Sequence, residues 1–377
     1  MGSVTNGADG ASRSRLGTVR SSATRPNTAK PPQGRRALLL AIGASAVVAV
    51  FAGLVRLGFG LPGAEWASDH GPLLVLGVFA SVVSLERAVA LGARLGYGAP
   101  LLGVLGAAAL VAHSPAAPWF TVGACAWLVV INAALVRRQP AAFTWLMLLG
   151  SIVLSAGTFV WALGNPVFVV APTWMGFFVL TIVAERLELS RLAPTPRWAS
   201  RLVVVLAVVL AASSSLSLAK PGLASRAMGG VLCGIALWQV AFDLARRTVR
   251  WPGLPRFAAI GVLMGTGWMA LAGVVLVWRG WVVSGPIYDA VLHAVFVGFV
   301  LSMVFAHAPI ILPAVARIAI PFHRALYVPL GVLHAGVLVR IVGDLAGLSE
   351  VRRVGGALNA VALASFLAAV AWSKRSR

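Results

Sequence analysis

LHAVFVGFVLSMVFAHAPIILP, at residues 292–313, contains no Asp, Glu, Lys or Arg. A helix of about 20 apolar residues is long enough to cross the hydrocarbon core of a membrane. The rest of the chain has the same character, since 59% of its 377 residues are hydrophobic, 11% are charged and the mean hydropathy is +0.91. The apolar runs are continuous, whereas the strands of a membrane barrel alternate. The stretch therefore predicts an all-α, polytopic membrane helix bundle surrounded by a lipid bilayer.

The hydrophobic runs divide the chain into about twelve transmembrane helices. They are expected at residues 37–58, 70–92, 98–113, 119–136, 142–163, 171–190, 200–218, 223–245, 256–278, 286–309, 322–342 and 354–373. Lys and Arg are concentrated in alternate connecting segments and in the C-terminal tail. By the positive-inside rule, this pattern predicts an inner-membrane protein with both termini in the cytoplasm. Because the basic residues account for the topology, the formal charge of +21 does not indicate nucleic-acid binding.

Residues 1–34 are polar and basic, and they predict a disordered cytoplasmic tail ahead of a transmembrane domain at residues 35–373. Cys125 and Cys233 each lie inside an apolar run, so they form neither a disulfide framework nor a zinc motif. The sequence contains no phosphate-binding loop, HExxH helix or nucleophile elbow. Whether the protein is an enzyme stays open at this point, and any chemistry would take place inside the membrane.

Three of the expected helices, numbers 2, 6 and 10, share a pattern in which a glycine is followed nine residues later by a polar side chain. The pairs are Gly77 and Glu86, Gly176 and Glu185, and Gly298 and His307. The constant spacing of four helices predicts a pseudo-threefold repeat with units at residues 37–136, 142–245 and 256–373. The alternative is chance similarity among helices that are all rich in Gly, Val, Leu and Ala.

Twelve helices arranged as three four-helix arcs resemble the catalytic subunit of the haem–copper oxidases, in which helices 2, 6, 7 and 10 carry the haem and copper ligands. Helices 6 and 7 of this chain contain no histidine, and it has neither an adjacent histidine pair nor a His-x-His in helix 10. An oxygen-reducing binuclear centre is therefore not expected. The chain is more similar to the divergent NnrS-like membrane proteins linked to nitric oxide stress. That resemblance implies a haem or copper cofactor, or both, a redox or nitrogen-oxide-related role, and other membrane redox proteins as partners.

Three histidines are the first candidates for metal or haem ligands, because neutral imidazole is the commonest metal ligand. His293 and His334 are expected at similar depth in helices 10 and 11, and His70 lies at the outer end of helix 2. A polar group deep in the membrane is costly and usually has a function. The resemblance adds weight to His70, since helices 2 and 10 hold haem between them in the oxidases. The alternative is that these histidines are interfacial residues or partners of nearby carboxylates.

A second candidate set, His307 and His323, lies toward the inner ends of helices 10 and 11. Position at a helix end makes a purely interfacial role the strong alternative for this pair. Asp289 is four residues before His293 and is positioned to orient its ring, and Asp69 adjoins His70. Arg340 is expected to be buried in helix 11, where it is a candidate partner for a haem propionate.

Glu86 with Arg87, and Glu185 with Arg186, occupy equivalent positions of the predicted repeat. Charges in hydrocarbon need partners, so we interpret them as structural ion pairs between arcs rather than a proton path. A second functional hypothesis is a cofactor-free transporter or permease of a small solute or ion, in which the buried Glu, Arg and His bind solute or relay protons. A scaffold or assembly factor of a larger membrane complex is a third.

Overall fold

The structure, a computed structural model, describes residues 33–192, 195–318 and 320–372. Residues 1–32 of the predicted tail therefore lie outside the described residues, whereas Gln33 and Gly34 already belong to the first helix. Within the described ranges the chain contains helices, turns and bends but no strand. Twelve of its helical segments are long and apolar enough to cross a membrane. The prediction of an all-α, polytopic bundle is confirmed.

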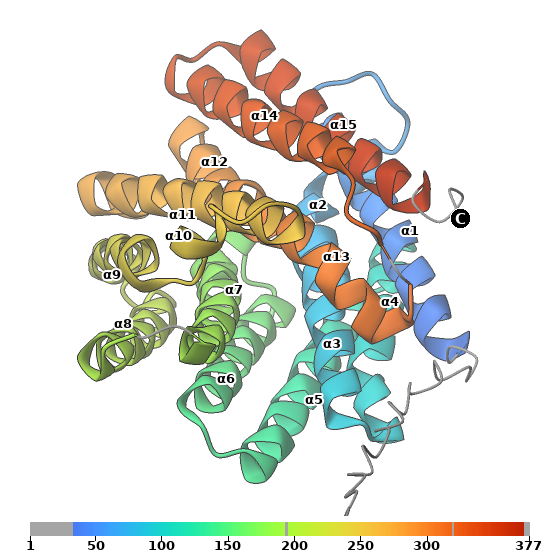
Figure 1. Cartoon of the computed structure of the whole chain (residues 1–377). Helices are drawn as coiled ribbons and strands as arrows, with labels where there is room; N and C mark the ends of the chain where they lie inside the picture. Colours follow the sequence, from blue (N-terminus) through green and yellow to red (C-terminus); the bar gives the residue numbers. More distant parts are fainter. Residues whose placement is uncertain (1–32, 193–194, 319, 373–377) are drawn as a thin grey trace, which may run out of the picture. The chain divides into compact units, whose positions relative to one another are not determined.

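The twelve spans follow one another in chain order (Figure 1). They are α1 (Gln33–Arg56); η1 (Ala64–Asp69), α2 (His70–Pro72), η2 (Leu73–Ala80) and α3 (Ser81–Leu91); η3 (Arg94–Tyr97) with α4 (Gly98–Val111); α5 (Ala117–Arg138); α6 (Ala142–Ala162); α7 (Val167–Leu189) with η4 (Ser190–Leu192); α8 (Arg197–Leu216); α9 (Pro221–Phe242); α11 (Leu254–Arg279); α12 (Pro286–His293), η5 (Ala294–Leu301) and α13 (Ser302–Ala316); η6 (Arg324–Leu326) with α14 (Tyr327–Leu345); and α15 (Ser349–Trp372). A short helix, α10 (Ala245–Thr248), connects α9 to α11.

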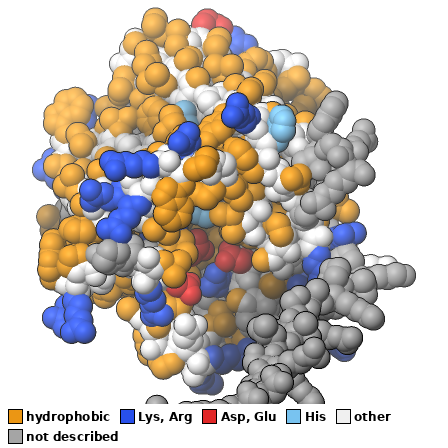
Figure 2. All heavy atoms as spheres, viewed as in Figure 1, with side chains coloured by type: hydrophobic (Ala, Val, Ile, Leu, Met, Phe, Trp, Pro, Cys, Tyr) orange, Lys and Arg blue, Asp and Glu red, His pale blue; other side chains and the backbone are white. Residues whose placement is uncertain are grey.

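Because successive spans alternate in direction, each end of a span belongs to one of two sides. We call the side on which α1 begins the N-side, and the other the far side. Arg56 at the end of α1 and His70 at the start of the second span then lie on the far side. Hydrophobic side chains cover much of the surface in Figure 2, with several Lys and Arg but few Asp and Glu side chains among them.

Local sequence explains where individual helices end. Pro221 and Pro286 stand in the first turns of α9 and α12, where a missing N–H costs nothing. Gly92 follows α3 with a positive φ of 70°, the left-handed geometry that terminates helices. Pro309 and Pro313 lie inside α13, which nevertheless continues beyond both of them. The tenth span is therefore not interrupted at its prolines, whereas discontinuous helices are typical of the substrate sites of transporters.

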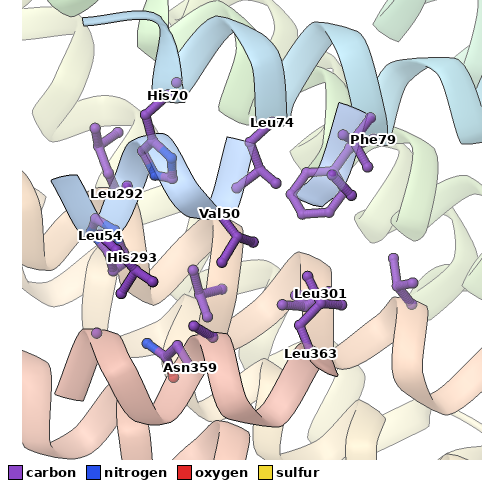
Figure 3. A pocket seen from close by; sticks show the side chains of 18 of the residues that line it. Val50, Leu54, His70, Leu74, Phe79, Leu292, His293, Leu301, Asn359 and Leu363 are labelled. Atoms are coloured by element: carbon purple, nitrogen blue, oxygen red, sulfur yellow. The ribbon is translucent and has the colours of Figure 1, made fainter. Parts of the chain in front are cut away.

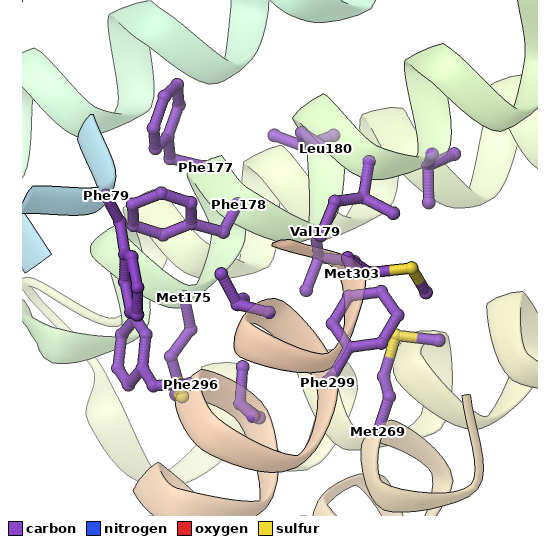
Figure 4. Packing of buried hydrophobic residues seen from close by; sticks show 14 of the residues in the cluster. Phe79, Met175, Phe177, Phe178, Val179, Leu180, Met269, Phe296, Phe299 and Met303 are labelled. Carbon is purple, nitrogen blue, oxygen red and sulfur yellow. The ribbon is translucent and has the colours of Figure 1, made fainter. Parts of the chain in front are cut away.

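The three spans related by the predicted repeat are the most buried ones. The buried share is 83% for Val167–Leu192, 72% for Pro286–Ala316 and 61% for Ala64–Leu91, against 22% for the spans formed by α1 and α15. Phe178 of α7 packs edge-on against Phe79 of the second span and Phe296 of the tenth, at ring-centroid distances of 5.9 and 6.0 Å (Figure 4). Spans 2, 6 and 10 thus meet in one aromatic core. The threefold repeat as such stays a prediction.

Spans 2 and 10 share a further feature that span 6 lacks: η2 and η5 are π-helical over eight residues each. Each π-helix contains the repeat glycine, Gly77 or Gly298. Each also follows closely on a histidine, since His70 begins α2 and His293 ends α12. π-Helical turns are rare and are often found at functional sites. The two histidines therefore occupy matching, unusual positions in the two spans.

Candidate functional site

A cavity of about 470 Å³ lies among α1, spans 2 and 10, α14 and α15 (Figure 3). Small-molecule sites have volumes of about 300–1,000 Å³ and are mostly apolar with a few convergent polar groups. The polar groups of this cavity gather toward the far side. We call that part the polar limb, and its wall contains Arg56, His70, Asp289, His293, Arg340 and Asn359. We call the remainder the apolar limb, and its wall contains Leu39, Gly43, Ala46, Ala308, Leu312 and Leu367.

The ring of His70 is held against α1. Its Nδ1 lies 2.7 Å from the carbonyl oxygen of Ala49, so Nδ1 carries the proton and donates it to that oxygen. The ring can approach α1 because the facing residue is Gly53, where a Cβ would lie 2.6 Å from the His70 Cε1 atom. With the proton on Nδ1, the lone pair of Nε2 is available to a ligand in the cavity.

His293 is held in the same way by its own helix. Its Nδ1 lies 2.8 Å from the backbone oxygen of Asp289, one turn earlier, and 3.4 Å from the Asp289 carboxylate. Nε2 is again the nitrogen with a free lone pair. Both rings lie at the same end of the cavity, His70 from the second span and His293 from the tenth (Figure 3). The structure therefore brings together two of the histidines that the sequence singled out.

Arg340 of α14 lies beside this pair, as expected for a buried cation of helix 11. Its side chain is 8% exposed and forms a two-pronged pair with Asp289, Nε to Oδ2 at 2.9 Å and Nη2 to Oδ1 at 3.1 Å. Asp289 therefore connects Arg340 to His293, which fits the orienting role expected for it. Asp69, by contrast, forms no hydrogen bond or ion pair with His70 among the described contacts.

Sequence reasoning missed Arg56 and Gly53, which also line the cavity. Arg56 is the last residue of α1 and forms no ion pair within the described part of the chain. The charge pattern did not single it out, because Arg279 stands at the far-side end of α11 in the same way. Gly53 gave no signal, because nothing in the sequence reveals which helix faces the ring of His70.

His334 is placed away from this site and deeper than His293, because its partner Ser302 lies nine residues beyond His293 in the tenth span. The expectation that the two histidines lie at similar depth is therefore wrong. Both of its ring nitrogens are occupied: Nδ1 accepts from Trp268 Nε1 at 2.9 Å, and Nε2 donates to Ser302 Oγ at 3.2 Å. Ser302 Oγ in turn donates to the carbonyl oxygen of Gly261 at 2.8 Å. The ring joins α14 to α11 and α13, and it offers no free lone pair.

The structure does not build an inner histidine site from His307 and His323. His307 Nδ1 donates to the backbone oxygen of Met303 at 2.8 Å, and Nε2 lies 3.4 Å from Arg186 Nη1. His323 is exposed, and its Nδ1 accepts the backbone N–H of Ala325 at 3.2 Å, which caps η6. Each ring therefore has a local structural partner.

The charged residues near the N-side form ion pairs. Arg87 lies 2.5 Å from Glu86 and 3.9 Å from Glu185, so it joins spans 2 and 6. Arg186 lies 3.4 Å from Asp243, just beyond α9. Burial raises the pKa of Asp243, while Arg186 and the backbone N–H of Ala245 act in the opposite direction.

The donor set at the cavity suits a haem better than a bare metal ion. Among the described residues no group of three or more His, Cys, Asp or Glu side chains is arranged to hold a metal ion. A porphyrin supplies its own four nitrogen ligands, so two facing imidazoles are sufficient for its iron. The polar limb also contains Arg56 and Arg340, which are cations of the kind that bind propionates.

Comparison with known proteins gives one family and no individual relative. Neither a curated protein nor a solved structure matches the chain. Residues 35–375, which include all of the membrane spans except the first two residues of α1, match the family described as "Domain of unknown function (DUF8744)". The chain therefore belongs to the DUF8744 family.

Proposed function

We propose that this membrane protein binds a haem in the polar limb, where His70 and His293 would hold its iron. The observation that carries the proposal is that two imidazoles from different spans line one cavity, each with Nδ1 committed to a backbone carbonyl. A hydrogen bond from the non-ligating nitrogen fixes the tautomer and orientation of metal-binding histidines. When bound, haem would supply one-electron transfer in a redox or nitrogen-oxide-related role, with other membrane redox proteins as partners.

The remaining residues of the polar limb orient the histidines and balance charge. Asp289 holds His293 through its backbone oxygen, while its carboxylate pairs with Arg340. Arg340 and Arg56 would bind the haem carboxylates toward the far side, where those groups reach water. The NnrS-like resemblance supports the same cofactor class. Copper is not part of the proposal, because the cavity offers two imidazoles and no further soft ligand.

The test is absorption spectroscopy of the protein purified from cells supplied with a haem precursor. We expect a Soret band and sharp reduced bands in the wild type, and loss of both in His70→Ala and in His293→Ala. His334→Ala serves as the matched control, because its ring lies outside the cavity and should leave the spectrum unchanged. A wild type without haem, or both ligand variants with an unchanged spectrum, would overturn the proposal.

We also propose that the N-side is the cytoplasm and that the membrane is the inner membrane. Support comes from the basic residues at N-side ends of the spans, such as Arg137 and Arg138 at the end of α5. The haem would then lie near the periplasmic surface. A labelling experiment that tests this orientation is given below.

A further inference from the structure

The cavity continues well beyond the histidines, into the apolar limb. Its wall on α1 extends from Gly53, opposite His70, to Leu39 near the N-side. From Val50 to Leu39 alone is about 16 Å at a helical rise of 1.5 Å per residue. Half of a hydrocarbon core of about 30 Å is about 15 Å. The apolar limb therefore has about the length of a lipid chain in one leaflet.

The apolar limb is lined only by side chains without nitrogen or oxygen, from α1, spans 2 and 10, and α15. At the far-side end α1 and α15 touch, since a Cβ on Gly356 would lie 2.2 Å from Leu57 Cδ1. Toward the N-side the cavity separates the two helices, and Phe366 of α15 stacks on Phe305 of α13 at 4.0 Å between ring centroids. Figure 3 shows Leu301 and Leu363 at the end remote from the histidines.

The limb is accessible from the bilayer. Leu367 both lines the cavity and is 46% exposed. It belongs to α15, which with α1 forms the least buried pair of spans. A molecule that enters here comes from the membrane rather than from water, because the middle of both helices exposes apolar side chains such as Leu40, Val47 and Leu367.

Cations lie at the N-side end of the limb. Arg35 and Arg36 precede Leu39 by four and three residues, so all three lie on one side of α1. Arg35 Nε donates to Tyr97 Oη at 2.6 Å, and Nη1 donates to the backbone oxygen of Val315 at 3.4 Å, so its guanidinium is held where α13 ends. Arg36 is exposed, and neither arginine forms an ion pair within the described residues.

We propose that the apolar limb binds one acyl chain of an anionic phospholipid of the N-side leaflet, with the phosphate at Arg36 and Arg35. The length of the apolar limb, its opening toward the bilayer and the two cations at the level of the headgroups together identify this ligand class. A long-chain quinone would leave the two cations without a counter-charge. The inference is independent of the haem proposal, because it uses the opposite end of the cavity and no histidine.

Gly43 provides a clean test. It lines the apolar limb, and a Cβ added there meets nothing within 4 Å, so Gly43→Leu fills the limb without disturbing the helix. Gly331 of α14 is the matched control, because it also has open space around an added Cβ but lies outside the cavity wall. Replacing glycine within a helix by leucine favours the helix by up to about 1 kcal/mol, so neither variant should lose stability.

The experiment is native mass spectrometry of delipidated protein titrated with palmitoyl-oleoyl phosphatidylglycerol, with phosphatidylcholine and decylubiquinone as the other probes. We expect one tightly bound phosphatidylglycerol in the wild type and in Gly331→Leu, and at least tenfold weaker binding in Gly43→Leu. Arg36→Gln should abolish the preference for phosphatidylglycerol over phosphatidylcholine. Haem content, measured in parallel, should be the same in all four proteins, so that failure of one proposal is distinguished from failure of the other.

Equal phosphatidylglycerol binding by the wild type and Gly43→Leu would overturn the inference. So would decylubiquinone binding that depends on Gly43 while phosphatidylglycerol binding does not, since the limb would then hold a neutral isoprenoid-type ligand. Unfolding temperatures of the variants are compared with the wild type, and the Gly43→Ala variant provides a second, smaller filling step if the leucine variant is unstable. Graded loss of binding from alanine to leucine supports the inference, and no loss in either refutes it.

Discussion

Gly53→Ala is the change that tests the proposed haem site most directly. The added Cβ would lie 2.6 Å from Cε1 and 2.8 Å from Nδ1 of His70, whereas ordinary contact begins at 3.4 Å. The ring must therefore move by about 0.8 Å, and its Nδ1 bond of 2.7 Å to Ala49 weakens or breaks. Neither histidine is altered chemically, so any loss of haem comes from the position of the ring.

The magnitude follows from the two effects of this displacement. Overpacking a well-packed contact costs about 1–3 kcal/mol, and losing the hydrogen bond costs about 1 kcal/mol. The two costs are not fully additive, because one movement of the ring both relieves the overpacking and breaks the hydrogen bond. If the free energy of haem binding becomes less favourable by about 1–3 kcal/mol, the dissociation constant for haem increases roughly 5- to 150-fold. We expect Gly53→Ala to bind haem within that range of weakening.

The assay is titration of the haem-free protein in detergent with haemin, followed at the Soret band. Gly43→Ala is the matched control, since it adds the same methyl group to the same helix in open space. Wild-type affinity and an unchanged spectrum in Gly53→Ala would refute the assignment of His70 as a ligand. Equal weakening in both variants would show that alanine in α1 acts through the helix rather than through the ring.

Three further outcomes are expected. Asp289→Asn leaves Arg340 buried without its anionic partner, which costs about 3–5 kcal/mol, so the unfolding temperature should fall clearly. The control Glu350→Gln, at a side chain 78% exposed, should leave the unfolding temperature unchanged. Equal unfolding temperatures of the two variants would contradict the burial argument. His334→Ala leaves Trp268 Nε1 without an acceptor, so it should destabilise the protein by about 1–3 kcal/mol while preserving the haem spectrum. A normal unfolding temperature together with loss of the haem spectrum would instead identify His334 as a ligand. A cysteine introduced as Arg138→Cys, in a background lacking Cys125 and Cys233, should react with a membrane-impermeant maleimide in inverted vesicles but not in intact spheroplasts; the reverse result would invert the topology.

The location of the predicted ion pairs does not favour the transport hypothesis. Glu86 and Glu185 share Arg87 near the N-side and do not line the cavity. One arginine and two acids form a bridge between spans 2 and 6, whereas Arg186, which the sequence grouped with Glu185, pairs with Asp243. The prolines of the tenth span leave its helix continuous. The two acids therefore lie apart from the cavity that holds the histidines.

The histidines illustrate what depth along a helix can and cannot predict. His293 and His334 were expected at similar depth, by counting residues from the expected far-side ends of helices 10 and 11. In the structure His293 follows the start of α12 by seven residues, whereas His334 precedes the end of α14 by eleven, so His334 lies deeper. His334 therefore meets Trp268 and Ser302, and Ser302 lies nine residues beyond His293 in the tenth span. His70, which lies at the outer end of helix 2, is the residue that lines the same cavity as His293.

The amino-acid sequence by itself determined the class of protein and the positions of its twelve spans, because about 20 apolar residues in a row can be satisfied only as a helix in lipid. It also predicted that His70 and His293 belong to related helices. Only the tertiary structure decided that these two rings share a cavity, that Gly53 makes room for one of them, and that an apolar limb extends beyond them between α1 and α15. Cavities and ring orientations arise from contacts between helices distant in sequence, and inside a membrane the hydrophobic pattern cannot reveal those contacts, because lipid and protein neighbours are equally apolar.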